Sequence, residues 1–342
     1  MSVYDRLVET LGLGGWCGED EGGGLISLNQ LTARNTGVET EGEAFPFPSM
    51  DVLHDACAKI PQARDLTTGL ENGFLNVKDE LKIVLDPLTQ PLSWMLDGSL
   101  TLFSAMPWWL LLPLLIGCAY WVSRSLRVTI FVALSFFFLG FIDHLEPAIQ
   151  TLSIVFVCTF ISVLLGVPIG ILMSKSDAVQ RISLPILDLL QTLPSFVYLI
   201  PLIFLFSVTE PKLYGIAIIL YAIVPIIRLT DLGIRLVDRS VIEAADAYGL
   251  SSKQKLFGIQ LPLALPNIMA GLNQTIMMSL AMVVIASLVS APGLGVLVLR
   301  GIRNLELGVG LVAGLGIVLL AVILDRTSKA ALDRINTGRA QQ

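Results

Sequence analysis

Apolar runs follow one another with only short polar breaks from Met106 to Leu324. A helix of about 20 apolar residues spans the hydrocarbon core of a bilayer, and its backbone polar groups are bonded within the helix. The runs therefore predict an all-α polytopic membrane protein with about seven transmembrane helices. We expect these helices near residues 106–122, 127–142, 147–173, 184–207, 213–230, 264–290 and 306–324.

The residues before the first apolar run differ in composition. The whole chain is 54% hydrophobic and 15% charged, but residues 1–104 hold 16 of its 28 acidic side chains and only 6 of its 22 basic ones. We therefore divide the chain into an acidic N-terminal extension, 1–104, and a transmembrane domain, 105–342. Residues 49–83 predict short amphipathic helices. Residues 88–105 predict an amphipathic helix lying along the membrane, although a buried globular helix fits them nearly as well. The acidic extension argues against a nucleic-acid partner.

Basic residues in the loops predict the orientation of the chain. Cytoplasmic loops of membrane proteins are enriched in Lys and Arg. With seven spans, most basic loop residues fall on the same side as the polar stretch 235–262, which we therefore expect in the cytoplasm. The N-terminus is then expected outside and the C-terminus in the cytoplasm. The basic residues on this side are Arg124, Arg127, Lys175, Arg181, Arg235, Arg239, Lys253, Lys255, Arg326, Lys329, Arg334 and Arg339.

The polar stretch 235–262 is the only long polar break in the apolar part of the chain. Ser240 and Glu243 fit the S-x-x-E capping box that begins a helix. Gly249 fits the left-handed residue that ends one. The stretch therefore predicts a helical hairpin between two membrane segments. The remaining boundary signals are Ser251 or Ser252 at the start of the second helix and Pro262 at the start of the next element.

The hairpin carries Glu-Ala-Ala, three residues, Gly, nine residues, Ile, one residue and Leu-Pro. This spacing matches the EAA loop of bacterial ABC-importer permeases at every position, so the hairpin resembles that loop. The resemblance implies the type I permease fold, with this loop forming the coupling helices that sit in a cleft of a separate ATP-binding subunit. It further implies a polar contact from Glu243 and close packing at Ala244, Ala245 and Gly249. The alternative is an ordinary solvated hairpin. The matching residues are Glu243, Ala244, Ala245, Gly249, Ile259, Leu261 and Pro262.

Two prolines, Pro194 and Pro201, interrupt the span predicted at 184–207. The polar side chains beside them either line a water-filled path or are buried between helices. The span at 264–290 is the candidate for the facing wall. Our candidates for the translocation path are Gln191, Thr192, Pro194, Ser195, Tyr198, Asn273, Gln274 and Met277.

Two ionisable residues, Asp188 and Arg228, lie inside apolar runs. Such residues point to function by default. Both are near the cytoplasmic ends of their predicted spans, however, so we expect snorkelling or a structural ion pair rather than a role in transport.

Several kinds of site have no sequence signal. The chain holds no G-x-x-x-x-G-K-[ST] phosphate-binding loop, so any ATP would be bound by a partner and no cofactor is expected in this chain. Its four Cys and two His residues lack ligand spacing, so no metal site is expected. No catalytic constellation indicates an enzyme. Cys17 and Cys57 share the extension and could pair if it lies outside the cytoplasm.

Beyond the hairpin, the stretch from Glu146 to Asp325 resembles permeases of glycine betaine/proline betaine importers. The runs that carry this resemblance are PILDLLQTLPSFVYLIPLIFLF (185–206), VPIIRLTDLGI (224–234), QLPLALPNIMAGLNQTIMMSLAMVVIAS (260–287) and LGVLVLRGI (294–302).

This second resemblance implies how such a chain works. Two permease chains, as a homodimer, would enclose a central path, two ATPase subunits would dock on the EAA loops, and an external binding protein would deliver a methylated amine. Glycine betaine, proline betaine and trimethylamine N-oxide are the expected substrates. One alternative is an ion-coupled secondary transporter of small zwitterions, for which only Asp188 is a candidate ion site. Another alternative is a membrane-anchored sensor that uses the N-terminal extension.

Overall fold

The computed structural model describes residues 8, 10–12 and 63–340, and these residues form helices and turns with no strand. The chain divides into two compact units, 1–79 and 80–342, which we describe separately. The predicted boundary between the acidic extension and the transmembrane domain, at residue 104, is not tested by this division and stays a prediction. The predicted pairing of Cys17 with Cys57 lies outside the described residues.

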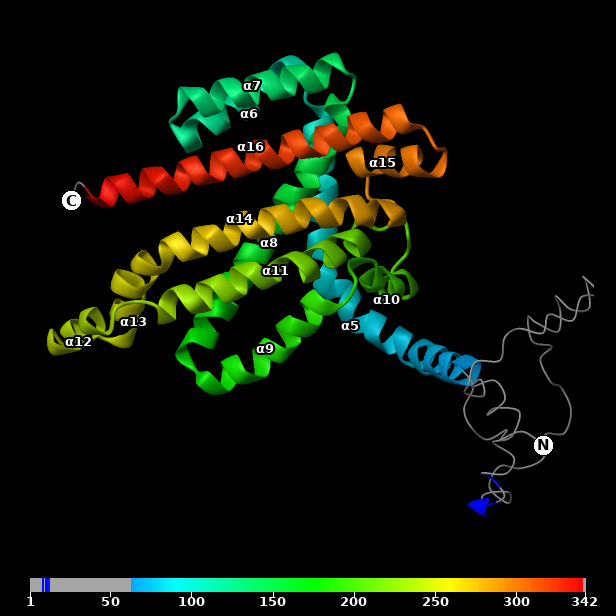
Figure 1. The fold of residues 1–342 in the computed structure, drawn as a ribbon, viewed down its shortest axis with the longest axis horizontal. Coiled ribbons are helices and arrows are strands. Elements are labelled where there is room, and N and C mark those ends of the chain that lie inside the picture. The colour runs from blue at the N-terminus through cyan, green and yellow to red at the C-terminus, as the bar shows by residue number, and fades with distance from the viewer. Residues whose placement is uncertain (1–7, 9, 13–62, 341–342) are drawn as a thin grey trace, which may run out of the picture. The chain divides into compact units, whose positions relative to one another are not determined.

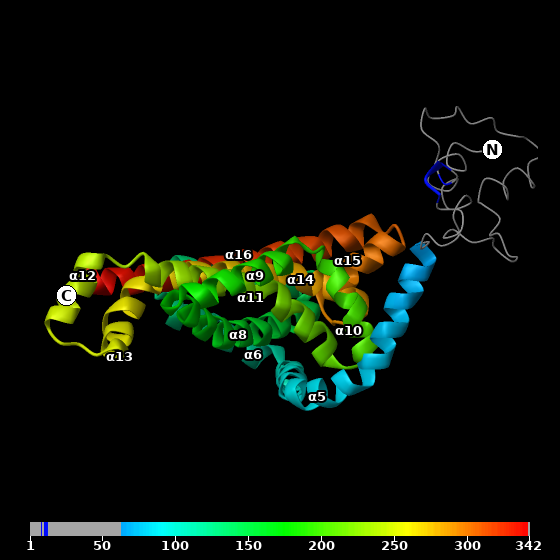
Figure 2. The same cartoon turned by 90° about the horizontal axis from the view of Figure 1, so that it is seen from below.

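The helices are named in chain order. They are α5 (Ala63–Ala105), α6 (Trp108–Ser123), α7 (Leu126–Phe141), α8 (Leu145–Lys175), α9 (Asp177–Thr192), η1 (Ser195–Tyr198), α10 (Leu199–Leu205), α11 (Pro211–Arg235), α12 (Arg239–Ala247), α13 (Ser252–Lys255), η2 (Leu256–Gln260), α14 (Leu261–Ala286), η3 (Ser287–Val289), α15 (Leu294–Arg303) and α16 (Leu307–Ala340). In the unit 80–342, α11, α14 and α16 run side by side, with α12 and α13 at one end and α15 at the other (Figures 1 and 2).

The described helices confirm an all-α polytopic membrane protein and revise the number of spans. Four helices are long and apolar enough to cross a bilayer: α8, α11, the continuous helix Ser252–Val289 and the part of α16 from Leu307 to Arg334. Two bent pairs, α5 with α6 and α9 with α10, raise the number to six if each pair counts as one span. The helix α7 is a shorter apolar helix. The seven predicted spans therefore become four to six by length.

The interruption predicted for the span at 184–207 is confirmed at Pro194. The segment is a pair of helices, α9 and 195–205, bent by 105°. Leu193 has φ −64° and ψ 132°, and Pro194 has φ −54° and ψ 130°. The ring of a proline disfavours helical backbone at the preceding residue, which explains why the helix ends at Thr192.

The short amphipathic helices predicted within 49–83 were also wrong for the part that is described, because α5 is one helix from Ala63 onward. In the unit 80–342, the later part of α5 packs on the membrane helices. Leu96 is fully buried, and the hydroxyls of Ser99 and Ser153 lie 2.5 Å apart. The ammonium of Lys212 lies 2.7 Å from a carboxylate oxygen of Asp86. The residues predicted as a helix along the membrane, 88–105, therefore pack against α8 and α11.

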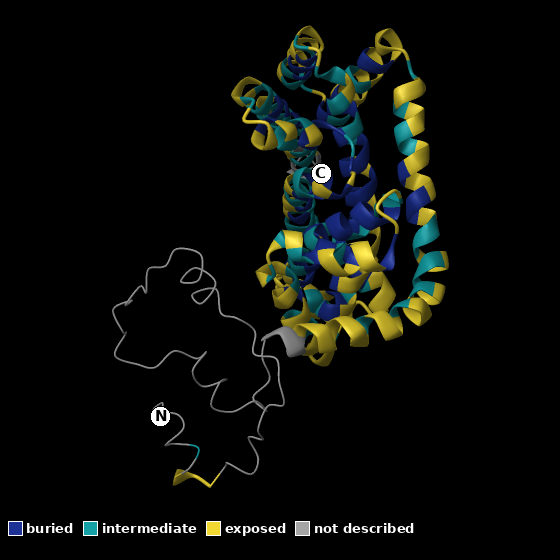
Figure 3. Cartoon of the chain, turned by 90° about the vertical axis from the view of Figure 1, so that its right-hand side faces the viewer, coloured by how far each residue is buried: buried dark blue, intermediate teal, exposed yellow. Residues whose placement is uncertain are grey.

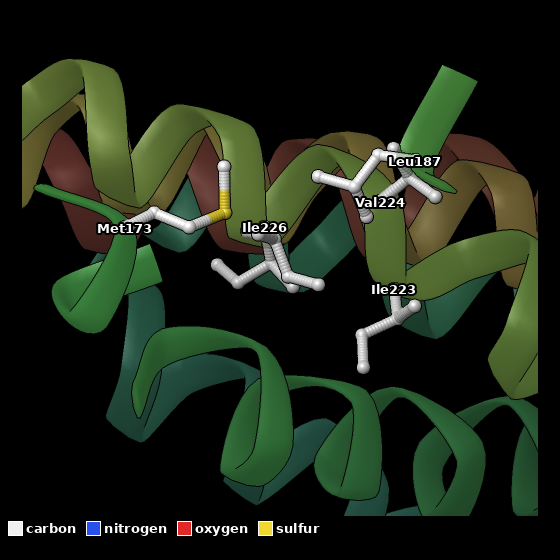
Figure 4. Packing of buried hydrophobic residues seen from close by; sticks show 6 residues of the cluster. Met173, Leu187, Ile223, Val224 and Ile226 are labelled. Carbon is white, nitrogen blue, oxygen red and sulfur yellow. The ribbon is translucent and has the colours of Figure 1, made fainter. Parts of the chain in front are cut away.

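Glycines let α8, α11 and α14 approach closely. A Cβ atom added to Gly170 of α8 would lie 2.6 Å from the Cβ of Thr230, and one added to Gly166 would lie 2.4 Å from a side-chain carbon of Ile226. Small residues are typical of helix contacts within membranes. The cluster around Ile226 joins α8, α9 and α11 (Figure 4).

Burial follows this packing. Buried residues concentrate where the helices contact one another, and exposed residues lie on their outward faces (Figure 3). The exposed residues include large apolar side chains such as Phe141 and Leu307. Apolar outward faces suit a chain whose solvent is lipid.

Candidate functional site

The polar hairpin is formed by α12 and α13 and begins at a cap that the sequence analysis missed. A carboxylate oxygen of Asp238 accepts a hydrogen bond of 2.9 Å from the backbone N–H of Ser240. The capping box predicted from Ser240 to Glu243 was therefore wrong, because Ser240 already lies inside α12. The bonds from Ser240 hold the pKa of Asp238 below its usual value. Asp is among the preferred N-cap residues, so Asp238 could have been recognised in the sequence as the residue that begins α12.

The turn between the two helices confirms the predictions for Gly249 and Ser251. Gly249 has φ +73°, in the left-handed region. The N–H groups of Gly249 and Leu250 donate to the carbonyls of Asp246 and Ala245, at 2.9 and 3.1 Å. Ser251 and Gln254 form a capping box at the start of α13. The hairpin thus has a defined turn whose backbone groups are bonded within the chain.

The second helix of the hairpin continues directly into the membrane. Pro262 lies at the start of α14, as predicted, but α14 follows the hairpin without a break, because residues Ser252–Val289 form one continuous helix. A π-helical turn, Leu256–Gln260, lies just before this proline, and the N–H of Leu261 donates to the carbonyl of Leu256. The wider turn accommodates a proline whose ring would clash with the carbonyl four residues earlier in a regular α-helix. The hairpin is therefore joined to α14 by unbroken helix.

The hairpin presents some of its motif residues outward and buries others. Glu243 and Ala244 are exposed, whereas Ala245 is only 3% exposed and faces its own chain. The carboxylate of Glu243 pairs with Arg239 at 3.2 Å. Tyr248, which is not part of the predicted motif, is 88% exposed at the turn. The motif residues Ile259, Leu261 and Pro262 are half-buried at the base of the hairpin.

An ion-pair cluster joins the hairpin side of three membrane helices. Arg235, the last residue of α11, lies 2.9 Å from Asp231 and 2.7 Å from Asp177 of α9. It also donates to the carbonyl of Met173 in α8, at 2.8 Å. The buried carboxylate of Asp231 accepts a further bond of 2.7 Å from the side-chain amide of Gln180. The spacing of Asp231 and Arg235, four residues apart on a helix, was the signal in the sequence.

The bend between α9 and α10 carries five of the candidate path residues. Gln191, Thr192 and Pro194 are exposed and Ser195 is half-buried. Tyr198 is buried, and its hydroxyl donates to the carbonyl of Leu190 across the bend. Tyr198 therefore braces the bend.

The remaining path candidates lie on α14 and differ in environment. Gln274 is exposed and Met277 is half-buried. Asn273 donates to the carboxylate of Asp325 at 2.9 Å and accepts from the hydroxyl of Ser328 at 2.8 Å. Both groups of its amide are thus bonded to α16.

The two ionisable residues within apolar runs form the expected ion pair. The guanidinium of Arg228 in α11 donates to the carboxylate of Asp188 in α9. A structural ion pair was one of the two roles expected for these residues, and it is confirmed. It is a second polar link between α9 and α11, which Arg235 also joins through Asp177.

Residues 162–336 match the sequence model of the family described as "Binding-protein-dependent transport system inner membrane component". The chain belongs to this family. It is therefore a permease subunit of an ABC importer and a multi-pass inner-membrane protein. Permeases of this kind imply an ATPase and a substrate-binding protein as partners.

Relatives agree with this membership, and a solved structure shares the fold. The permease is 41% identical to the glycine betaine transport system permease protein OpuAB of Bacillus subtilis (strain 168), over 71% of this chain and 86% of that protein. It is 40% identical to the glycine betaine/proline betaine transport system permease protein ProW of Escherichia coli (strain K12), over 91% of this chain and 83% of that protein. A chain of the inward-facing MetNI methionine ABC transporter shares the fold, with a TM-score of 0.51 and 19% identity over 56% of this chain and 95% of that one.

Proposed function

We propose that this permease imports methylated amines, with glycine betaine, proline betaine and trimethylamine N-oxide as the substrate class. The names of the relatives OpuAB and ProW support glycine betaine, and that of ProW also proline betaine. The chain performs no chemistry itself and binds no cofactor, because ATP is bound and hydrolysed by the partner subunit.

The proposed ATPase-docking surface is the outward side of α12 and the turn that follows it. The observation that carries this proposal is the continuous helix Ser252–Val289, which joins the hairpin to the membrane without a flexible link. Glu243 supplies the polar contact, and Ala244 and Gly249 allow close approach. Ala245, which is buried in its own chain, contributes by packing α12 against the rest of the permease. Ile259, Leu261 and Pro262 hold the base of the hairpin.

The proposed translocation path follows the bend of α9 and the facing side of α14. Exposed polar side chains such as Gln191, Thr192 and Gln274 would be costly against lipid. A second copy of the permease would enclose them, which supports a homodimer around a central path. Pro194 and Ser195 shape the bend, Tyr198 braces it, Met277 lines the facing wall, and Asn273 positions α14 against α16.

The proposed orientation places the hairpin and the C-terminus in the cytoplasm and, for the odd number of spans that the sequence predicts, the N-terminus outside. It rests on the basic residues of the loops on the hairpin side. An ATPase that docks on α12 would require the same orientation.

Substrate-stimulated ATP hydrolysis tests the proposal. The full-length permease would be reconstituted in proteoliposomes with its ATPase and binding protein, then given glycine betaine, proline betaine, choline, carnitine or trimethylamine N-oxide. We expect one or more of these methylated amines to stimulate hydrolysis only when the binding protein is present. An intact complex that none of them stimulates would overturn the proposed substrate class.

A further inference from the structure

A small cavity lies in the corner where α5 turns into α6, beside the start of α8. It has a volume of about 200 Å³. Drug-sized ligands occupy sites of roughly 300–1,000 Å³, so this cavity suits a small group. The corner exists because α5 ends at Ala105, Pro107 adopts extended backbone with ψ 144°, and α6 leaves at 116° to α5.

The cavity lies at the end of the bundle remote from the hairpin. Arg235 bonds to Met173, which places the last turn of α8 beside the hairpin end of α11. The cavity is lined by the first turns of α8, including Glu146 and Ile149. At about 1.5 Å per residue, most of the length of α8 separates the cavity from the proposed ATPase-docking surface.

The lining combines two aromatic rings and one carboxylate with five apolar side chains, which are Leu100, Met106, Leu111, Leu145 and Ile149. Phe103, Trp108 and Glu146 line the cavity together with the polar side chains of Ser104 and Gln150, and no Lys or Arg is among the lining residues. Within the described part of the chain, the Glu146 carboxylate has neither an ion-pair partner nor a hydrogen-bonded one. Cations bind over the faces of aromatic rings, most strongly Trp, and quaternary ammonium groups are recognised this way. A lone carboxylate without basic neighbours favours a cation over an anion.

The neighbouring residues place the cavity at the level of lipid headgroups. Trp108 and Trp109 begin α6, and both are more than half exposed. Trp residues concentrate where a membrane meets water. A group bound here would therefore be reached both from the headgroup layer and from the solution beyond it.

We propose that this cavity binds a methylated ammonium cation, separately from the translocation path. Trp108 and Phe103 supply the aromatic walls, and Glu146 supplies the counter-charge. Glu146 also lies in the first turn of α8, where a carboxylate complements the helix dipole, but that role leaves its oxygens free to face a cation. The cation belongs either to a choline headgroup of a lipid or to a free methylated amine, and the chemistry of recognition is the same.

Saturation-transfer NMR on the full-length permease in a maltoside detergent tests this site. The probe is tetramethylammonium, whose equivalent methyl protons give one sharp signal, and tert-butanol serves as a neutral probe of similar shape. We expect transfer to tetramethylammonium and little to tert-butanol. A cation–π contact is worth about 1 kcal/mol, so we expect Trp108→Leu to weaken binding about fivefold and Glu146→Gln to weaken it at least as much.

Matched variants control for the loss of an aromatic ring and of a charge nearby. Trp109→Leu removes the adjacent exposed Trp, and Asp143→Asn removes an exposed carboxylate from the preceding loop; neither residue lines the cavity. Both should bind the probe as the unaltered permease does. Unchanged binding in Glu146→Gln and Trp108→Leu, or an equal loss in the two controls, would overturn the proposal. Thermal unfolding of each variant separates a loss of the site from a loss of the fold.

Competition then identifies the source of the cation. Displacement by a short-chain phosphatidylcholine, but not by the matching phosphatidylglycerol, indicates a lipid headgroup. Displacement by glycine betaine or choline indicates a free solute. If neither class of competitor displaces the probe, the cavity is not a site for a methylated ammonium group.

Discussion

The guanidinium of Arg235 donates a hydrogen bond of 2.8 Å to the backbone carbonyl of Met173. Arg235 ends α11 and Met173 lies in the last turn of α8. Asp238, which caps α12, is only three residues further along the chain. Arg235 therefore links the chain just before α12 to the ends of α11 and α8 and, through Asp177, to the first turn of α9. The helix α9 leads from this first turn to the bend at Pro194.

Replacing Arg235 tests this connection. Arg235→Gln removes the ion pairs with Asp231 and Asp177, and we expect it to destabilise the permease by about 1–3 kcal/mol because charged hydrogen bonds are lost. We also expect less substrate taken up per ATP hydrolysed in proteoliposomes. Lys329→Gln is the control, since Lys329 is itself exposed and pairs within α16, away from this cluster. Equal transport coupling in the two variants would show that the cluster is only structural.

Glycine at position 170 sets the distance between α8 and α11. Gly170→Ala would place a Cβ 2.6 Å from the Cβ of Thr230 and 2.7 Å from the carbonyl oxygen of Ile227. We expect destabilisation of about 1–3 kcal/mol, as for other overpacked contacts, measured by thermal unfolding in detergent. Gly314→Ala is the matched control, because a Cβ there would meet nothing within 4 Å. A variant at Gly170 as stable as the one at Gly314 would contradict the close packing of α8 on α11.

The bend between α9 and α10 depends on Pro194. Pro194→Ala removes the restriction on Leu193, so the two helices can approach a straighter arrangement. We expect normal insertion into the membrane and reduced uptake of substrate. Pro185→Ala, within α9 and exposed, should transport as the unaltered permease does. Normal uptake by Pro194→Ala would mean that the bend has only a structural role and is not part of the translocation path.

Docking of the ATPase depends on the outward side of α12. Glu243→Arg reverses the charge of an exposed side chain whose pair with Arg239 contributes only about 0.5 kcal/mol or less. The permease should therefore stay folded and inserted but lose co-purification of the ATPase. Glu306→Arg makes the same change at the pair with Arg300, beside α15, and should retain the ATPase. Full retention by Glu243→Arg would count against the proposed docking surface.

Local signals in the sequence predicted much of the hairpin. Gly249 was expected to adopt the left-handed conformation, and this prediction is confirmed. Ser251 or Ser252 was expected to cap a helix, and Ser251 is the cap. Such features depend on residues a few positions apart, so one sequence suffices to predict them. The cap at Asp238 was missed because Ser240 to Glu243 offered an equally good local pattern.

Features that depend on distant contacts were harder to predict. The apolar run 184–207 is long enough for one span, and the prolines alone did not say whether the helix would kink or break. Around the break, the hydroxyl of Tyr198 donates to the carbonyl of Leu190 and Arg228 pairs with Asp188. The bonds from Asn273 to Asp325 and Ser328 join residues more than 50 positions apart. No periodic pattern in the sequence indicates such a distant partner. Asn273 could therefore be recognised as an unusual polar residue, but its bonding to α16 could not be predicted.

In the proposed function, ATP drives transport by this chain through the hairpin. The most direct measurement is the uptake of radiolabelled glycine betaine into proteoliposomes that hold the permease, its ATPase and its binding protein. We predict uptake that requires ATP on the hairpin side and is unchanged when ionophores collapse proton and sodium gradients. Uptake without ATP, driven by an imposed ion gradient and abolished by the ionophores, would contradict the account and indicate an ion-coupled transporter.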